Sequence, residues 1–248
     1  MQILTSISSY QIEIVFSDGK FYNAIHADYL LNAKVCYDES SYNASTYVWN
    51  DRTNNNNNTN LSSSCVLEPI TNNNSTSTLN NVKLVGNVTV LNKTATNTAS
   101  NFALFAVGRN HSTNSYFLCN NDYTPSHTFG TWETLYQSIY WGTRWLNSLI
   151  FEGGRAINNN VYTLFNDTSG NGYYYFNRSN SNAITNDGSK PFRAFPNVDF
   201  GRGYSSYYPG SIASIAFICF FNITITEQIA RCIEYCLFVQ YSITNKEP

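Results

Sequence analysis

Short runs of β-branched and aromatic residues, separated by stretches rich in Asn, Ser and Gly, constrain the fold of this chain most strongly. In SYQIEIVF (9–16) apolar side chains alternate with polar ones, and the turn-forming SDGK (17–20) follows. NVYTLF (160–165) and YYYFN (173–177) flank a turn at 166–172, which predicts a second β-hairpin. Similar runs occur at 81–91, 102–107, 196–200 and 210–221, the last typical of a strand buried on both faces. The pattern shows no strand–helix–strand alternation and therefore predicts an all-β sandwich or jelly roll.

The pattern changes to a helical one only near the C-terminus. Thr224-x-x-Glu227 has the spacing of a capping box, so a helix is expected to begin near Thr224 or Thr226. Residues at helical spacing follow it: Ile229, Cys232, Ile233 and Cys236. The segment 131–151 fits neither period and stays unassigned.

Two low-complexity polar tracts, at 54–60 and 72–77, have little to bury and are predicted to be exposed loops with freedom to move. Strand-like segments surround them, so they read as insertions in a fold rather than as linkers. We therefore expect residues 1–46 to add N-terminal strands to the same sandwich. Residues 47–248 would form the jelly roll, with Asn-rich loops at 53–80.

Charged residues make up only 12% of the 248 residues, while 42% are hydrophobic and 16% are aromatic. The chain can bury a core, and its polar surface must be built mainly from Asn, Ser, Thr and Tyr. Lys and Arg are scattered and the net charge is −2, so we expect no nucleic-acid partner. The apolar run at 211–225 is short and interrupted by polar residues, so we expect no membrane insertion.

Six cysteines, an even number, indicate disulfides rather than a zinc site, because none has metal-ligand spacing. Free buried thiols are the alternative. A Cys36–Cys65 bridge would close the Asn-rich loop, whereas Cys232 and Cys236 share a helix face and would each reach a different partner. The pairing stays open among Cys36, Cys65, Cys119, Cys219, Cys232 and Cys236.

Glycosylation acceptors of the Asn-x-Ser/Thr type are dense, although chance produces several of them in so Asn-rich a chain. They are Asn43, Asn57, Asn60, Asn73, Asn74, Asn87, Asn92, Asn110, Asn166, Asn177 and Asn222. With the cysteines, they favour an extracellular or virion-surface location. The first residues, MQILT, do not look like a secretory signal. We therefore expect part of a longer surface protein, or a virion component without its own signal.

The C-terminal half resembles the concanavalin-A-like lectin and glucanase superfamily in its laminin-G-like form. The matching stretches are VYTLFNDTSGNGYYYFN (161–177), DFGRGYSSYYPGSIASIAFICFFN (199–222) and TITEQIARC (224–232), which follow the family's order of hairpin, turn, closing strand and short helix. YVWNDRTNN (47–55) is similar to the early Trp-x-Asp-x-Ser-Gly-Asn segment of such domains. Arg178 replaces the Gly expected after the hairpin Asn. The resemblance implies a concanavalin-A-like jelly-roll sandwich with one short C-terminal helix.

Glycosidases of this superfamily carry two carboxylates at alternate or near-alternate positions of one strand, because acid and nucleophile must flank one bond. No such pair occurs in this sequence, and the adjacent Asp38 and Glu39 would point to opposite sides of a strand. We therefore expect a protein that is not an enzyme, with a diverged glycosidase as the remaining catalytic alternative.

Metal and histidine chemistry are also weakly indicated, and no cofactor is expected. The three histidines, His26, His111 and His127, are far apart and lie in no nucleophile or metal signature, which favours structural or surface roles. Calcium is the one metal that fits, through turn carboxylates that otherwise form ordinary Asx turns: Asp167, Asp187 and Asp199.

Tyrosines supply the most suggestive candidate for a ligand site. GRGYSSYYPG (201–210) places several rings in a Gly/Ser/Pro loop, and a hairpin run of tyrosines accompanies it. Exposed rings suit stacking on sugars or anchoring a protein interface, although at least half are expected to pack inside. The predicted ligand-binding set is Tyr173, Tyr175, Tyr204, Tyr207 and Tyr208.

The sequence thus predicts a surface-displayed adhesion or receptor-binding module, as on a viral spike or fibre. Its expected partner is a host or cell-surface glycan or glycoprotein. The alternative is a structural virion or filament subunit in which tyrosines mediate self-assembly.

Overall fold

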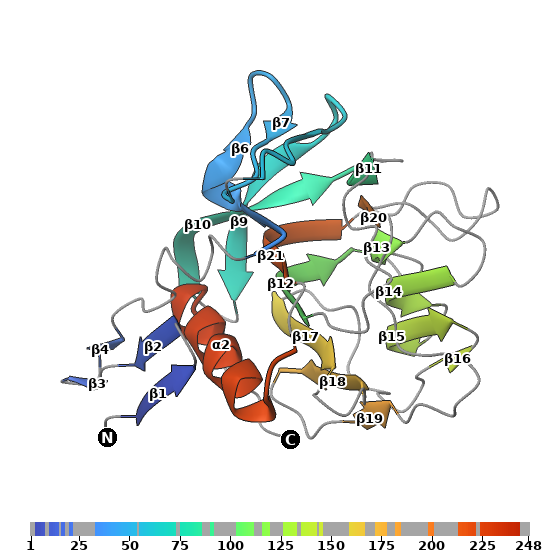
Figure 1. Ribbon diagram of the computed structural model, residues 1–248. Coiled ribbons are helices and arrows are strands. Elements are labelled where there is room, and N and C mark those ends of the chain that lie inside the picture. Colours follow the sequence, from blue (N-terminus) through green and yellow to red (C-terminus); the bar gives the residue numbers. More distant parts are fainter. Residues whose placement is uncertain are drawn as a thin grey trace.

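The computed structural model consists mainly of antiparallel strands, with one α-helix near the C-terminus in the part of the chain that it describes (Figure 1). The described residues are 3–7, 10–14, 16–17, 20–21, 33–53, 55–72, 75–85, 90–91, 103–111, 116–119, 126–132, 135–142, 144–145, 159–166, 172–177, 182–184, 198–200, 213–221 and 224–243. The predicted all-β fold with a short C-terminal helix is confirmed.

The larger sheet has eight strands, ordered β19-β18-β17-β12-β21-β10-β9, with β5 also paired to β21. Their bounds are β5 Val35–Asp38, β9 Val66–Asn72, β10 Ser75–Leu84, β12 Ala103–Asn110, β17 Asn160–Asn166, β18 Gly172–Phe176, β19 Asn182–Ile184 and β21 Ala213–Phe221. β10 pairs with residues 213–215 of β21 and β5 with residues 217–220, so the two strands share one edge of β21 in succession. Apart from the partly buried Phe220, β21 is buried along its length, as the sequence predicts.

The second sheet has six strands, ordered β11-β20-β13-β14-β15-β16, and its strand β13 lies against β12 and β21. Its strands are β11 Val90–Leu91, β13 Tyr116–Cys119, β14 Ser126–Trp132, β15 Leu135–Gly142, β16 Arg144–Trp145 and β20 Val198–Phe200. The segment 131–151, which periodicity leaves unassigned, thus supplies strands of this sheet.

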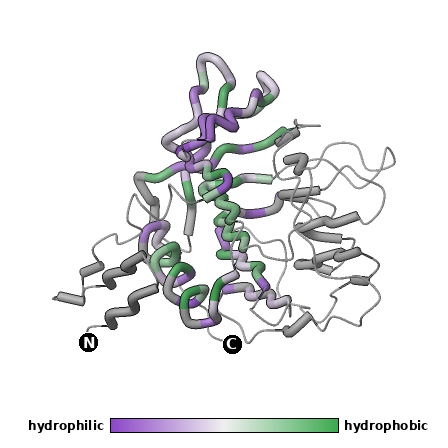
Figure 2. Tube along the Cα trace, in the orientation of Figure 1, coloured by the Kyte–Doolittle hydropathy of each residue, from purple (hydrophilic) through white to green (hydrophobic). Residues whose placement is uncertain are grey.

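Three smaller sheets complete the described structure. β1 (Ile3–Ile7) pairs with β2 (Tyr10–Ile14), and β3 (Phe16–Ser17) with β4 (Lys20–Phe21), which forms the hairpin predicted at SDGK. The short 3-10 helix η1 (Glu39–Ser41) leads into the sheet β6 (Tyr42–Asn43), β7 (Val48–Trp49) and β8 (Thr59–Asn60). We call residues 33–65 the N-terminal lobe. Figure 2 shows this lobe with hydrophilic, intermediate and hydrophobic stretches side by side.

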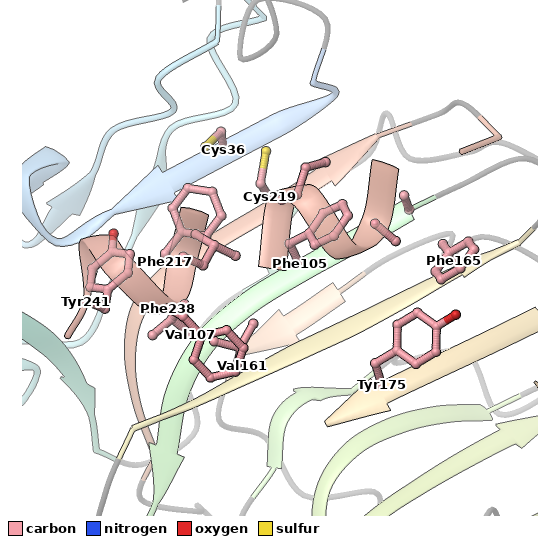
Figure 3. Close-up of a cluster of buried hydrophobic side chains, with 14 of the residues drawn as sticks. Cys36, Phe105, Val107, Val161, Phe165, Tyr175, Phe217, Cys219, Phe238 and Tyr241 are labelled. Carbon is pink, nitrogen blue, oxygen red and sulfur yellow. The ribbon is translucent and has the colours of Figure 1, made fainter. Parts of the chain in front are cut away.

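Helix α2 (Glu227–Gln240) covers the hydrophobic core of the larger sheet. Phe238 of α2 packs in one cluster with Phe105 and Val107 of β12 (Figure 3). Of the two expected start positions, Thr224 and Thr226, the structure has the cap at Thr226. Its hydroxyl accepts the backbone N–H of Ile229 at 3.3 Å. The Thr226 hydroxyl therefore caps the start of the helix.

Of the two Asn-rich tracts predicted to be exposed loops, the first is largely exposed as expected, whereas the prediction is wrong for the second. Residues 72 and 75 pair directly across the β9–β10 hairpin, so the second tract consists largely of strands. In the first tract, Asn55 and Asn57 donate side-chain hydrogen bonds to backbone carbonyls of residues 33 and 34. These amides attach the loop to the start of β5, which composition alone does not reveal.

Candidate functional site

Charged side chains, which are scarce in this chain, gather on one face of the larger sheet. The Glu68 cluster consists of Glu68 (β9), Lys83 (β10), Arg109 (β12), Ser214 (β21) and His111, which follows β12. Lys83, Ser214 and Arg109 stand opposite one another on three neighbouring strands. Glu68 lies two residues from the partner of Lys83, and His111 two residues from Arg109, so all five share a face.

A single carboxylate connects the cluster. Glu68 Oε1 accepts from Arg109 Nη2 at 2.6 Å, from Arg109 Nε at 3.1 Å and from the Ser214 hydroxyl at 2.5 Å. The His111 ring nitrogen Nε2 lies 2.6 Å from Ser214 Oγ and 3.3 Å from Glu68 Oε1. Lys83 Nζ is 3.7 Å from Glu68 Oε2. The contacts fix the positions of one anion among three basic side chains.

Electrostatics keep Glu68 ionised. Burial alone raises the pKa of this carboxyl, but hydrogen bonds from His111, Ser214 and Arg109 outweigh it and lower the pKa to about 2. At neutral pH the cluster therefore combines one carboxylate with the positive charges of Arg109 and Lys83. The cluster therefore contains both hydrogen-bond donors and acceptors, and its positive charges outnumber its one negative charge.

The cluster is partly open to solvent at Lys83 and His111. The side chain of Lys83 is 32% exposed and that of His111 23%, against 15% for Glu68 and for Arg109. Val66, which stands opposite Lys83 in the same row, is 48% exposed. An apolar side chain thus lies beside the polar row, a combination that suits a ligand with both hydroxyl groups and C–H faces.

A buried pair of asparagine side chains lies next to the Glu68 cluster. Asn81 stands opposite Glu68 in the β9–β10 register, and its amide exchanges two hydrogen bonds with that of Asn159, at 3.1 and 2.7 Å. Both asparagines are buried. Because the two amides satisfy each other's hydrogen-bonding groups, the pair holds the start of β17 close to β10, beside the cluster.

The predicted tyrosine site is only partly described. Tyr204, Tyr207 and Tyr208 lie outside the described residues, so that part stays a prediction. Tyr175 requires a correction, because its side chain is completely buried and the Arg231 guanidinium lies 3.7 Å above its ring centre. Tyr173 is partly buried and stacks on Phe165 with ring centres 5.1 Å apart.

The structure contradicts one predicted cysteine pairing. Cys36, Cys65 and Cys219 are buried with free thiols, and the expected Cys36–Cys65 bridge is not formed, because Cys36 faces Cys219 across β5 and β21. Cys236 is also buried. The side chains of Cys119 and Cys232 lie outside the described set.

Among the acceptor asparagines, Asn166 is completely buried, so its amide cannot carry a glycan in this fold. Asn43 and Asn60 are exposed, whereas Asn57 and Asn177 are half-buried and use their amide nitrogens in hydrogen bonds. Nothing is described for the side chains of Asn73, Asn74, Asn87, Asn92, Asn110 and Asn222.

Metal-binding candidates fall mostly outside the described part of the chain. Asp167, Asp187 and His26 are not described, and for Asp199 and His127 only the backbone is. Within the described residues, no three His, Cys, Asp or Glu side chains gather as metal ligands. No described helix is both long and apolar enough to cross a membrane.

Sequence reasoning missed the Glu68 cluster, because its members are distant along the chain and each looks isolated. The sequence does contain one hint of the cluster. Charged residues are scarce in this chain, yet Glu68, Lys83 and Arg109 all fall within or beside apolar strand runs. Only strand register, however, brings them to one face.

Comparison with known proteins places the fold. No protein-family model and no curated protein matches the sequence. Among solved structures, domain 4 of AbnA, an extracellular arabinanase from Geobacillus stearothermophilus in complex with arabinotriose, has a TM-score of 0.54 at 10% identity, covering 82% of this chain and 98% of that one. The chain shares the β-sandwich fold of this domain.

Two neurotoxin structures have the same degree of likeness. The binding domain of botulinum neurotoxin DC in complex with rat synaptotagmin II matches with a TM-score of 0.55 and 10% identity. A botulinum neurotoxin type C structure, described as dependent on two ganglioside molecules for cell entry, matches with 0.55 and 11%. These alignments cover 83% and 87% of this chain but only 52% of each toxin chain, so this chain spans about half their length.

Proposed function

We propose that this chain is a surface-displayed binding module that recognises a glycan or glycoprotein of a cell surface. The observation that carries the proposal is the partly exposed Glu68 cluster on a β-sandwich. The solved domains of this fold are described with arabinotriose, with synaptotagmin II and with gangliosides, which supports the same class of ligand here. The proposed location is extracellular, or the surface of a virion, as on a spike or fibre.

The chemistry of the cluster suits a sugar. Sugar hydroxyls both donate and accept, and Glu68 with Arg109 and His111 offers fixed partners of both kinds. Val66 adds exposed apolar surface next to Lys83 for the C–H face of a ring. Tyr207 and Tyr208 remain the proposed stacking residues. In this proposal the module binds without catalysing, and calcium is not required.

Binding to a glycan array and to immobilised cell-surface glycoproteins tests the proposal. We expect Lys83→Ala to weaken binding about 3- to 10-fold, because a charge at the open side of the cluster is lost. Arg52→Ala is the matched control, since it removes one positive charge from an exposed ion pair in the N-terminal lobe. Equal loss in both variants would point to net charge rather than to the cluster.

Three further measurements test the tyrosine residues, the role of calcium and the catalytic alternative. A Tyr207→Ala/Tyr208→Ala variant tests the stacking residues, and EDTA tests calcium. Release of free sugar from bound glycans would indicate a diverged glycosidase instead of a binding module. Absence of binding to every surface tested would contradict the proposed function.

A structural subunit is the second candidate, favoured by one observation. β9 is the last strand of the larger sheet as described, and its Val66 and Leu67 are 48% and 41% exposed. Exposed apolar residues on an edge strand promote pairing with another chain. Sedimentation that depends on protein concentration, and that Leu67→Lys abolishes, would support self-assembly.

A further inference from the structure

Cys36 and Cys219 are opposite partners in the β5–β21 ladder, although they lie near opposite ends of the chain. Both side chains are completely buried. The two thiols are hydrogen-bonded to each other, and Figure 3 shows their sulfur atoms within the core cluster. They thus form a pair set by register.

Strand geometry places this pair within reach of a covalent bond. Directly opposed residues of antiparallel strands have Cα atoms about 4.5–5.5 Å apart. Disulfides span Cα distances of about 4.4–6.8 Å. From this register, burial and thiol contact, we propose that Cys36 and Cys219 form a cross-strand disulfide when the chain folds in an oxidising compartment.

The bond forms by thiol–disulfide exchange with a small-molecule disulfide such as oxidised glutathione. One cysteine thiolate attacks the reagent, which gives a mixed disulfide and releases one glutathione. The second cysteine then attacks the protein sulfur of that intermediate and releases the second glutathione. Two protein thiols are oxidised to one disulfide, and one glutathione disulfide is reduced to two thiols that take up the protons.

The exchange belongs to folding rather than to the finished structure. Burial, followed by the hydrogen bond with Cys36, raises the pKa of the Cys219 thiol, so little thiolate exists once the core is closed. Burial also restricts access of the oxidant. The bond would fasten β5 to β21 immediately beyond the point where β10 leaves the same edge.

Peptide mapping of refolded, unglycosylated protein tests the proposal. Reduced, denatured chain is refolded in a glutathione redox buffer, checked by circular dichroism, alkylated and digested with trypsin without reduction. Cleavage after Lys34, Arg52, Lys83, Arg202 and Arg231 places Cys36 in peptide 35–52, Cys65 in 53–83 and Cys219 in 203–231. We expect 35–52 to be recovered covalently linked to 203–231.

The controls make the result specific. Cys65→Ser should leave the linkage intact, and reduction should lower Tm of the wild type by about 6–12 °C. The same reductant should leave Tm of Cys36→Ala/Cys219→Ala unchanged. Recovery of 35–52 linked to 53–83, or alkylation of both Cys36 and Cys219 in protein with native circular dichroism, would overturn the proposal.

Discussion

At the scale of single residues, Glu68 determines how the charges of the larger sheet respond to pH. Its folded pKa of about 2 lies below the ordinary 4.5, so its stabilising contribution is present above pH 4.5 and is lost as the pH falls towards 2. Glu68→Gln should therefore reduce the free energy of unfolding by about 2 kcal/mol at pH 7 and by much less at pH 2.5.

Urea unfolding at the two pH values measures this difference. Glu227→Gln is a suitable control, since that side chain is 59% exposed and pairs with Arg231 across one helical turn. A deficit in Glu68→Gln that stayed equal at both pH values would contradict the role given to the ionised carboxylate.

Burial also distinguishes the acceptor asparagines. Asn43 and Asn60 are exposed on the N-terminal lobe, whereas Asn166 is enclosed by the larger sheet. In protein secreted by a glycosylating host we expect glycan at Asn43 and Asn60 and none at Asn166, because a glycan there is incompatible with β17. Mass spectrometry after enzymatic deglycosylation reads the occupancy of each site, and a modified Asn166 in folded protein would contradict the burial.

At the scale of elements, α2 is attached to β17 through a buried carboxylate. Glu234 accepts from the Thr163 hydroxyl at 3.0 Å and from Arg231 Nη1 at 3.2 Å, and Arg231 lies over Tyr175 of β18. Arg231→Ala removes the cation beside a completely buried Glu234, so we expect a loss of about 3 kcal/mol in unfolding free energy.

Replacing both partners tests the origin of that loss. Arg231→Met/Glu234→Leu should recover most of the stability in a thermal melt, because no buried charge remains without a cation. If the double variant were as unstable as the single one, packing of Arg231 on Tyr175 would be the dominant contribution.

At the scale of the whole molecule, the N-terminal lobe and the larger sheet should unfold together. β5 belongs to both, and the Asp51 carboxylate joins the lobe to it by accepting the backbone N–H groups of Cys36, Thr53 and Asn57. Asp51→Ala should therefore lower the stability of the whole chain by about 2–4 kcal/mol in one transition.

Far-ultraviolet circular dichroism and the fluorescence of Trp49, recorded in the same melt of a chain whose other three tryptophans are replaced by Phe, decide the point. Trp49 lies in the lobe, and Asn50→Ala is the control, because it removes one exposed side-chain hydrogen bond and should cost less than about 1 kcal/mol. A separate early transition in fluorescence would show that the lobe unfolds independently.

The amino-acid sequence by itself determined the class of the fold. The two runs at 160–165 and 173–177 that flank a turn, the buried run at β21 and the helical spacing near Thr226 are local properties, and each produced the element it predicts. Such patterns act within a few residues, so they can be read without knowing what packs against them.

Only the tertiary structure decided which side chains meet. Glu68 reaches Arg109 and Ser214, and Cys36 faces Cys219 rather than Cys65, because strand order and register bring together residues far apart along the chain. The same long-range pairing buries Tyr175 and Asn166, which local composition presents as surface groups. Register is a collective property of whole strands, and a shift of one residue would move every one of these side chains to the opposite face.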